Sequence, residues 1–222
     1  MNPLPQHEAS SLIAALLHTI SDRLVPLTQR GVDSGSKVFA AAVLSRSTLE
    51  PLSVATNNER ASPLLHGEIA CIQAFFTVDF PDPSARPDTG RDCIFLATHE
   101  PCSLCLSGIA WSGFREFYYL FTHEDSRDVF SIPHDIDILT QVFRVRGSQE
   151  SDEQLGKRAL YNKTNRFFSG RAVGELLDGL PCEADRERWR REIRRVKDLY
   201  NGLSETYQAR MRSGAESSSV WR

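Results

Sequence analysis

Two short stretches of the sequence carry side chains that could bind a metal ion. The first, PLLHGEIACI, places His66 and Glu68 two positions apart inside an otherwise apolar segment. The second, THEPCSLCLSGIAW, carries Cys102 and Cys105 three positions apart. A lone histidine at the start of an apolar helix is more often a core residue than a ligand, so the two stretches are informative only together.

Both stretches fit the beginning of a helix. A spacing of three puts Cys102 and Cys105 on one face of a first turn, and the partial positive charge of a helix N-terminus favours thiolates. Two thiolates and the imidazole of His66 form a three-ligand set typical of catalytic zinc, which keeps a fourth position open. Glu68 would stand beside the metal without binding it, where a carboxylate can carry protons to and from activated water.

The order of these residues also matches a known signature. H-x-E followed by P-C-x-x-C is the pattern of zinc deaminases, whose glutamate moves protons and is not a ligand. Residues from about 37 to 125 therefore resemble the cytidine deaminase superfamily. The similarity is strongest to the branch that includes guanine deaminases, yeast-type cytosine deaminases and tRNA adenosine deaminases. HGEI resembles the cytosine deaminase version of the motif, and EPCSLCLSGIAW resembles the guanine deaminase version.

The resemblance implies roles for individual residues. It implies that His66, Cys102 and Cys105 bind Zn²⁺ and that Glu68 is the catalytic proton carrier. It also implies a set of substrate-binding positions, which are Asn57 or Asn58 in the loop before the helix, Gly67, Glu100 and Trp111. For Glu100 and Trp111, a surface carboxylate and a core aromatic are the structural alternatives.

Alternating strand and helix patterns are expected to position these residues. An amphipathic helix is predicted from about Glu8 to Leu24, ended by Pro26. Strands are predicted over residues 37–46, 49–57, 93–100 and 115–123, and helices over 66–78 and 101–113. This alternation indicates an α/β fold. The resemblance implies a three-layer α/β/α sandwich of the cytidine deaminase-like type with a helical C-terminal extension.

The chain after Asp125 has a weaker pattern. Residues 131–143 could form a helix and RVRG, residues 144–147, a short last strand. Farther on, a short helix is predicted over 170–181 and a longer one over 183–211. We therefore predict a zinc-dependent deaminase domain over residues 1–150 and a helical extension over residues 151–222.

The longer C-terminal helix carries an apolar stripe that has two interpretations. Its members recur at alternating steps of four and three: Trp189, Ile193, Val196, Tyr200, Leu203 and Tyr207. Such a stripe can form a coiled coil with a second copy or pack on its own domain, and Gly202 weakens a continuous coiled coil. Because the family resemblance also implies dimers, a homo-oligomer is expected.

Composition and charge limit the possible partners. With 222 residues, 41% of them hydrophobic, and a net charge of -3, the chain has the composition of a globular protein without overall attraction to nucleic acid or anionic lipid. The most basic segment, RERWRREIRRVK, interleaves arginines with acidic residues at helical spacing, which favours a solvated surface.

The sequence also favours a cytoplasmic location. The apolar run LIAALL is too short to cross a membrane, and no basic cluster of a signal peptide precedes it. Five cysteines without the spacing of a disulfide scaffold fit a reducing compartment.

These patterns predict a zinc-dependent hydrolase that acts on C–N bonds of cyclic amidines. Its substrate is expected to be a small amino-heterocycle, namely a free nucleobase, a nucleoside, or a related purine, pyrimidine or pterin, from which ammonia is released. Three alternatives stay open: a tRNA adenosine deaminase, a structural zinc module in which His99 is the fourth ligand, and a binding or regulatory protein that keeps the deaminase fold and zinc site without turnover. A closed four-ligand site would leave Glu68 without a chemical role.

Overall fold

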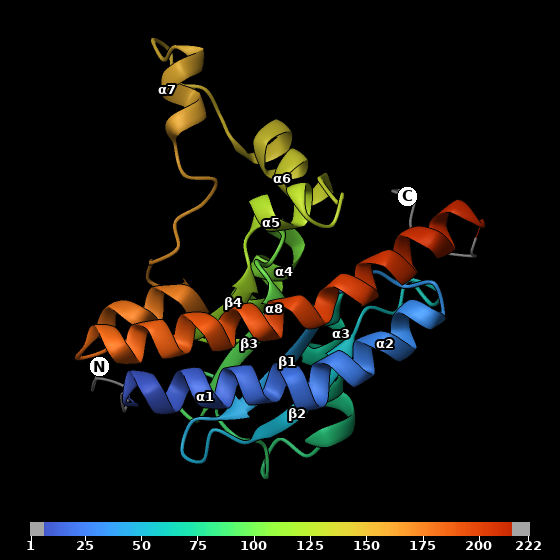
Figure 1. The fold of residues 1–222 in the computed structure, drawn as a ribbon, viewed down its shortest axis with the longest axis vertical. Coiled ribbons are helices and arrows are strands. Elements are labelled where there is room, and N and C mark those ends of the chain that lie inside the picture. Colours follow the sequence, from blue (N-terminus) through green and yellow to red (C-terminus); the bar gives the residue numbers. More distant parts are fainter. Residues whose placement is uncertain (1–6, 215–222) are drawn as a thin grey trace.

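A five-stranded mixed sheet forms the centre of the computed structural model, which describes residues 7–214 (Figure 1). The strands lie in the order β2 (Pro51–Thr56), β1 (Ala40–Ser45), β3 (Cys93–His99), β4 (Glu116–Phe121) and β5 (Ser169–Ala172). Strand β1 is antiparallel to both β2 and β3, whereas β3, β4 and β5 are parallel. The parallel strands end at the same edge of the sheet.

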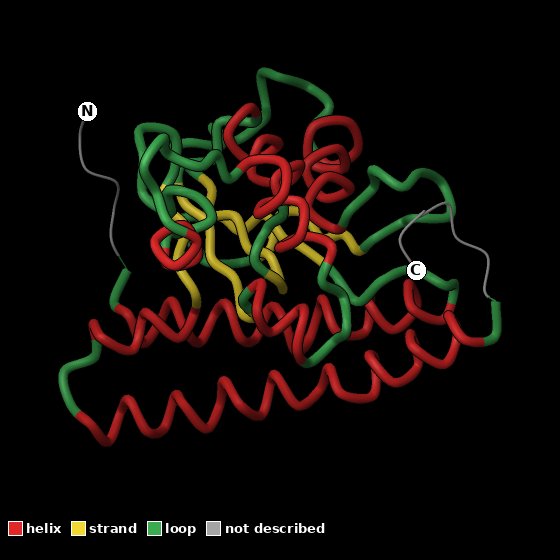
Figure 2. Tube along the Cα trace, turned by 90° about the horizontal axis from the view of Figure 1, so that it is seen from above, coloured by secondary structure: helices red, strands yellow, loops and turns green. Residues whose placement is uncertain are grey.

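Helices cover both faces of this sheet (Figure 2). On one face lie α1 (Ala9–Thr19), the π-helix η1 (Ile20–Leu24), α2 (Val25–Asp33), the 3-10 helix η4 (Val173–Gly179) and α8 (Glu183–Arg212). On the other face lie α3 (Gly67–Ala74), the π-helix η2 (Phe75–Asp79) and α4 (Ser103–Trp111).

Strand β1 shows how the sequence produces two cores. Ala40, Ala42 and Leu44 face α1 and α8, while Ala41 and Val43 face α3 and α4, because successive side chains of a strand point to opposite faces. All five are fully or almost fully buried, as a strand with helices on both sides requires. The predicted three-layer α/β/α sandwich is therefore confirmed.

Four short helices follow β4 and lead the chain away from the sheet. They are α5 (His123–Asp128), α6 (His134–Ile138), the π-helix η3 (Leu139–Phe143) and α7 (Asp152–Lys157). The predicted helix over residues 131–143 is confirmed by α6 and η3.

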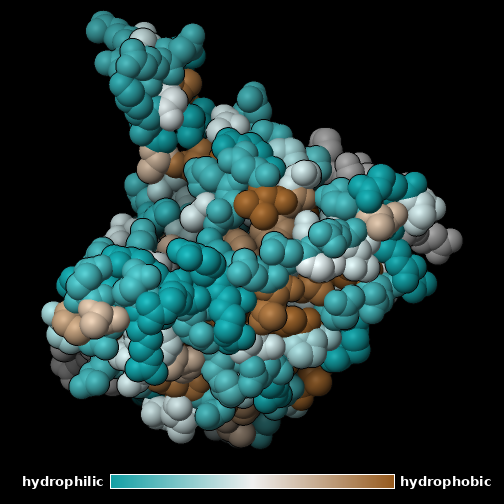
Figure 3. Space-filling model, in the orientation of Figure 1, coloured by the Kyte–Doolittle hydropathy of each residue, from teal (hydrophilic) through white to brown (hydrophobic). Residues whose placement is uncertain are grey.

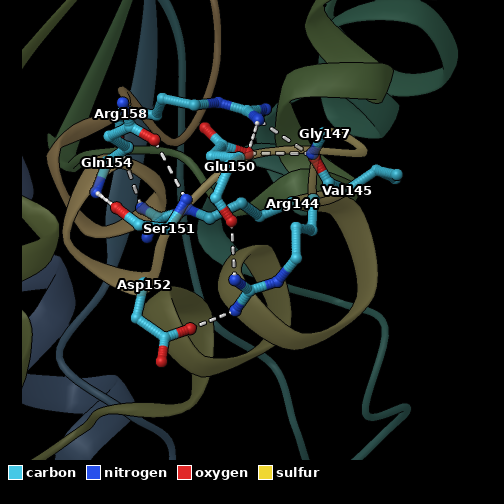
Figure 4. A network of polar contacts seen from close by, with 9 residues as sticks. Arg144, Val145, Gly147, Glu150, Ser151, Asp152, Gln154 and Arg158 are labelled. Atoms are coloured by element: carbon cyan, nitrogen blue, oxygen red, sulfur yellow. Dashed lines mark hydrogen bonds and ion pairs between the residues drawn. The ribbon is translucent and has the colours of Figure 1, made fainter.

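Residues 144–160, which we call the arm, carry α7 on a segment that projects from the body (Figure 1). A local polar network holds the arm's shape (Figure 4). In this network Arg158 binds Glu150 at 2.8 Å, and Arg146 pairs with Asp152. The hydroxyl of Ser151 accepts the N–H of Gln154 and caps α7. These contacts join residues of the arm to one another rather than to the sheet.

Pro26 does not end the first helix, contrary to the prediction. The helical segment that begins at Ala9 passes through η1 and continues as α2 to Asp33. Pro26 lies in the first turn of α2, directly after the wider turn of η1. A proline is tolerated there because the N–H groups of a first turn need no intrahelical acceptor.

The predicted last strand is also wrong. Residues 144–147 are irregular and belong to the arm. The last strand is β5, whose last three residues fall in the segment predicted as a helix over 170–181. Strand β5 has only four residues, and a side chain at Gly170 would overlap the ring of Phe117. Pairing with β4 defines this strand, and four residues are too few to show a periodic pattern.

The predicted C-terminal helix is confirmed as α8, and its apolar stripe packs on the chain's own core. Trp189, Val196, Tyr200, Leu203 and Tyr207 are buried in the same cluster as α1 and the sheet. The outward surface of α8 is mostly hydrophilic (Figure 3). Packing on its own domain is therefore the correct interpretation of the stripe. The division at residue 150 stays a prediction.

No helix within residues 7–214 has both the length and the apolar character that crossing a membrane requires.

Candidate active site

Three potential ligand atoms converge where α3 and α4 begin. His66 and Cys102 are the N-cap residues of these two helices, and Cys105 lies in the first turn of α4. Nδ1 of His66 lies 3.4 Å from Sγ of Cys102 and 3.7 Å from Sγ of Cys105. The two sulfur atoms are 3.5 Å apart.

These separations fit a zinc ion. Tetrahedral bonds of about 2.3 Å to sulfur and about 2.0 Å to nitrogen place two sulfur atoms about 3.8 Å apart and a sulfur and a nitrogen about 3.5 Å apart. The three residues form the one group of at least three potential metal ligands found within residues 7–214. His66, Cys102 and Cys105 would therefore hold zinc from three directions and leave the fourth to a water or substrate.

His99 does not take part in this group. Its ring stacks on Phe121 at 4.7 Å and meets Phe39 and Phe130 edge to face. Its Nδ1 lies 3.0 Å from Oγ1 of Thr98. A closed site with His99 as fourth ligand is therefore wrong.

Gly67 allows the start of α3 to lie directly on β1. A side chain at this position would bring a Cβ within 2.8 Å of Cα of Ala40 and 2.9 Å of the carbonyl oxygen of Phe39. The N–H of Gly67 donates to Oδ1 of Asn57 at 2.5 Å. Asn57 thus satisfies one of the unpaired N–H groups at the start of α3 and fixes the adjacent His66.

The carboxyl group of Glu68 is buried beside the ligand atoms. The side chain is 5% exposed, and its Oε2 has no hydrogen-bond partner among the described residues. Burial, and to a lesser extent the nearby charge of Cys102, raise the pKa of Glu68 to about 7. A carboxyl group with this pKa can both accept and release a proton near neutrality.

The thiol of Cys102 is the most acidic part of the ligand set. The hydrogen bond from Cys105, together with the hydrogen bond and charge of His66, holds the pKa of Cys102 well below its ordinary value. The thiolate is the form that binds zinc, so this environment prepares Cys102 for metal binding.

A cavity of about 390 Å³ opens beside His66 and Cys102. Its walls include the apolar side chains of Phe39, Leu64 and Leu104. Two charged residues that the sequence analysis missed, Lys37 and Asp135, also line it. No local spacing links them to the zinc motif, since Lys37 precedes β1 and Asp135 lies in α6.

The two charged residues of the cavity have different surroundings. The ammonium group of Lys37 binds Oε1 of the buried Glu59 at 2.5 Å. Burial, followed by the charge of Cys102, raises the pKa of Asp135 to about 8. The cavity therefore offers a cation on one wall and a carboxyl group that titrates near neutrality on another.

The predicted substrate-binding residues have different positions. Asn57 and Gly67 lie at the start of α3 beside His66, and the buried Nδ2 of Asn57 has no partner among the described residues. Asn58 is exposed, and Trp111 is 91% exposed at the end of α4. Glu100 is 4% exposed and bonded to protein groups. The contacts of these five residues with a substrate stay predictions.

Comparisons with known proteins agree with this geometry. Residues 17–121 match the model of the cytidine and deoxycytidylate deaminase zinc-binding region. No curated protein matches the sequence.

Several solved structures are similar to this chain. Guanine deaminase from Bacillus subtilis has 23% identity and a TM-score of 0.45, over 67% of this chain and 86% of its own. Guanine deaminase from Nitrosomonas europaea has 17% identity and a TM-score of 0.44, over 88% and 87%. A structure from a study of tRNA:A34 deaminases has 17% identity and a TM-score of 0.38, over 52% and 78%.

The family match spans the whole predicted zinc site. It includes the histidine, both cysteines and Glu68, and its last residue is the end of β4. The model of the cytidine and deoxycytidylate deaminase zinc-binding region thus matches the part of this chain that holds His66, Cys102 and Cys105.

Proposed function

We propose that this protein is a zinc-dependent hydrolytic deaminase of a small amino-heterocycle. The substrate would be a free nucleobase, a nucleoside, or a related purine, pyrimidine or pterin. The observation that carries the proposal is the convergence of His66, Cys102 and Cys105 beside the buried carboxyl group of Glu68.

The reaction divides between the metal and Glu68. Zinc held by the three ligands would act as a Lewis acid and make water nucleophilic near neutral pH. Glu68 would accept a proton from this water and deliver it to the ring nitrogen next to the amino-bearing carbon as the water oxygen becomes bonded to that carbon. Glu68 would then take the remaining proton of this oxygen and transfer it to the amino group as the C–N bond breaks. The products are ammonia and the corresponding oxo compound.

The cavity supports a small substrate. Its volume of about 390 Å³ lies within the usual range of small-molecule sites, and its apolar walls suit the faces of a heterocycle. Lys37 can donate to a ring carbonyl, and Asp135 can bind a ring N–H or amino group.

The surface of α8 gives little support for a nucleic acid substrate. Arg186 and Arg190 pair with Glu183 at 3.2 and 2.5 Å, and Arg195 pairs with Glu192 at 2.6 Å. These pairs neutralise much of the most basic segment, which leaves it less able to bind a row of phosphates.

An ammonia-release assay tests the proposed substrate class. Guanine, cytosine, their nucleosides and amino-pterins are offered beside bulk tRNA. The purines 8-azaguanine and 2,6-diaminopurine, which are bound in similar solved structures, serve as further probes. We expect ammonia from at least one small molecule. Inosine in tRNA with no small molecule turned over would favour the tRNA-editing alternative.

Elemental analysis tests the metal assignment separately. We expect about one zinc per chain, because one three-ligand group is present. Cys102→Ala and Cys105→Ser should lose most of the zinc together with activity. Active protein without zinc would contradict the assignment.

We also propose that the protein is a cytoplasmic homodimer. The five cysteines are all free, which agrees with a reducing compartment. The exposed Trp111 on α4 supports a second copy as partner.

A further inference from the structure

A buried carboxylate joins three distant segments of the chain next to the zinc ligands. Glu100 directly follows β3, stands two residues before Cys102 and is 4% exposed. Its N–H donates to the carbonyl oxygen of Phe121 at 2.7 Å, which fixes its backbone to the end of β4. A carboxylate at such a position is costly to bury unless protein groups satisfy both of its oxygen atoms.

Both oxygen atoms are satisfied, and their partners come from different parts of the chain. Oε1 accepts the hydroxyl of Tyr161 at 2.7 Å and lies 3.2 Å from the ammonium group of Lys163. Oε2 accepts the backbone N–H of His123 at 3.2 Å. Lys163 also donates to the hydroxyl of Tyr119 on β4 at 2.5 Å. We call Glu100, Tyr119, His123, Tyr161 and Lys163 the Glu100 cluster.

His123 ties this cluster to the residue that precedes Cys102. Its Nε2 lies 3.2 Å from the carbonyl oxygen of Pro101, and since a carbonyl only accepts, the imidazole donates this bond. The N–H of the same residue binds Glu100. His123 therefore fixes both the carboxylate of Glu100 and the backbone carbonyl of Pro101.

The position of Cys102 depends on these two residues. Cys102 has an extended backbone with φ of -67° and ψ of 174°, and its side chain makes no capping bond to α4. Its carbonyl oxygen accepts the N–H of Leu106 at 2.8 Å, so α4 holds Cys102 from the following side, and Glu100 and Pro101 hold it from the preceding side. Outer groups that orient a ligand typically change metal affinity by about 10- to 100-fold when removed.

We propose that the Glu100 cluster positions Cys102 for zinc, and that Tyr161 and Lys163 make the metal site dependent on the segment that returns from the arm. Glu100 is then a positioning residue, which acts through Pro101 and Cys102. This inference rests on the zinc site of the proposed function, but it does not depend on which compound is deaminated.

A matched pair of tyrosine variants tests the inference. Tyr161→Phe removes the hydroxyl bond to Glu100, and Tyr118→Phe removes a similar bond from Tyr118 to Glu116 at the other end of β4. Zinc affinity is measured by competition with a chromogenic chelator, and the thermal stability of the metal-free protein is measured in parallel. We expect Tyr161→Phe to weaken zinc binding by about 10-fold and Tyr118→Phe to leave it within about twofold of wild type.

A purely structural role would give a different result. Both variants would then lower the melting temperature of the metal-free protein and leave zinc affinity unchanged. Lys163→Met provides a second measurement because it removes the ammonium group and keeps the Tyr161 hydroxyl bond to Glu100. Unchanged zinc affinity in both Tyr161→Phe and Lys163→Met would overturn the inference. A zinc-binding wild type without deaminase activity would instead contradict only the proposed function.

Discussion

Glu68 is a carboxyl group whose chemistry can be separated from the binding of the metal. It lies beside the three ligand atoms, but its side chain is not one of them. We predict that Glu68→Gln keeps zinc and the fold and loses at least about 100-fold in turnover, because an amide cannot carry the proton. Zinc content and ammonia release are measured on the same preparation. Glu205→Gln, an exposed change on α8, is the control, and a wild-type rate in Glu68→Gln would show that another group moves the proton.

Single residues of the site differ in how far the sequence reveals them. The sequence predicts four of them: His66 and Glu68 at the start of α3, and Cys102 and Cys105 at the start of α4. The two residues of each pair lie within one helical turn, so their spacing in the sequence is enough to indicate a metal site. The cavity residue Asp135 could not be predicted, since α6 approaches the site only after the chain has passed β4 and α5. Tertiary folding brings such residues together, and a contact between residues far apart in the sequence leaves no local sequence pattern.

At the level of elements, the contact between α3 and β1 depends on one missing side chain. We predict that Gly67→Ala destabilises the protein by about 1–3 kcal/mol, because its Cβ would lie 2.8 Å from the backbone of Ala40. Zinc affinity should fall as well, since the adjacent His66 must move. Urea unfolding and chelator competition measure the two effects.

A second glycine provides the control for this change. Gly202 lies inside α8, and the place where its Cβ would lie is open space, so Gly202→Ala should stabilise the protein by about 0.5–1 kcal/mol through helix propensity. Equal effects of the two substitutions would mean that the close approach of α3 to β1 is not required.

The elements that sequence patterns predicted correctly are those with a clear period or a long apolar run. Strands β1, β3 and β4 are almost completely buried, and α8 has a regular stripe. The errors have local physical causes. The π turn of η1 lets the helix continue past Pro26. Strand β5 has only four residues and forms through its hydrogen bonds to β4.

At the level of the whole molecule, His99 makes stability depend on pH. Its ring is buried among Phe39, Phe121, Phe130 and Tyr200. Burial, followed by the charge of Lys197, holds the pKa of His99 well below its ordinary value of 6.5. Above pH 6.5 the ring is neutral in both the folded and the unfolded chain, so its contribution is fully present. Below this pH His99 becomes protonated in the unfolded chain and stays neutral in the folded chain. The free energy of unfolding therefore falls by up to about 1.4 kcal/mol per pH unit.

The comparison of wild type with His99→Gln isolates this effect, because both proteins share the acid-sensitive zinc ligands. We predict that the difference in unfolding free energy between them shrinks as the pH is lowered from 7 toward 5 in urea titrations. A difference that stays constant over this range would show that His99 can be protonated in the folded protein.

The assembly of the whole molecule is expected to depend on the outer face of α4. Leu104 and Trp111 are 37% and 91% exposed, seven residues apart on this helix, which contains no charged residue. An uncharged surface that exposes a tryptophan is typical of a protein interface, and the stripe of α8, which is buried in the chain's own core, is not available for one.

We predict that the wild type sediments at twice the chain mass of 25.0 kDa at micromolar concentration and that Trp111→Glu sediments as a single chain. Val142→Glu, at a 66% exposed position on η3, should leave the mass of the wild type unchanged. A single-chain mass for the wild type would reject the dimer, and a dimeric Trp111→Glu would place the interface on another surface.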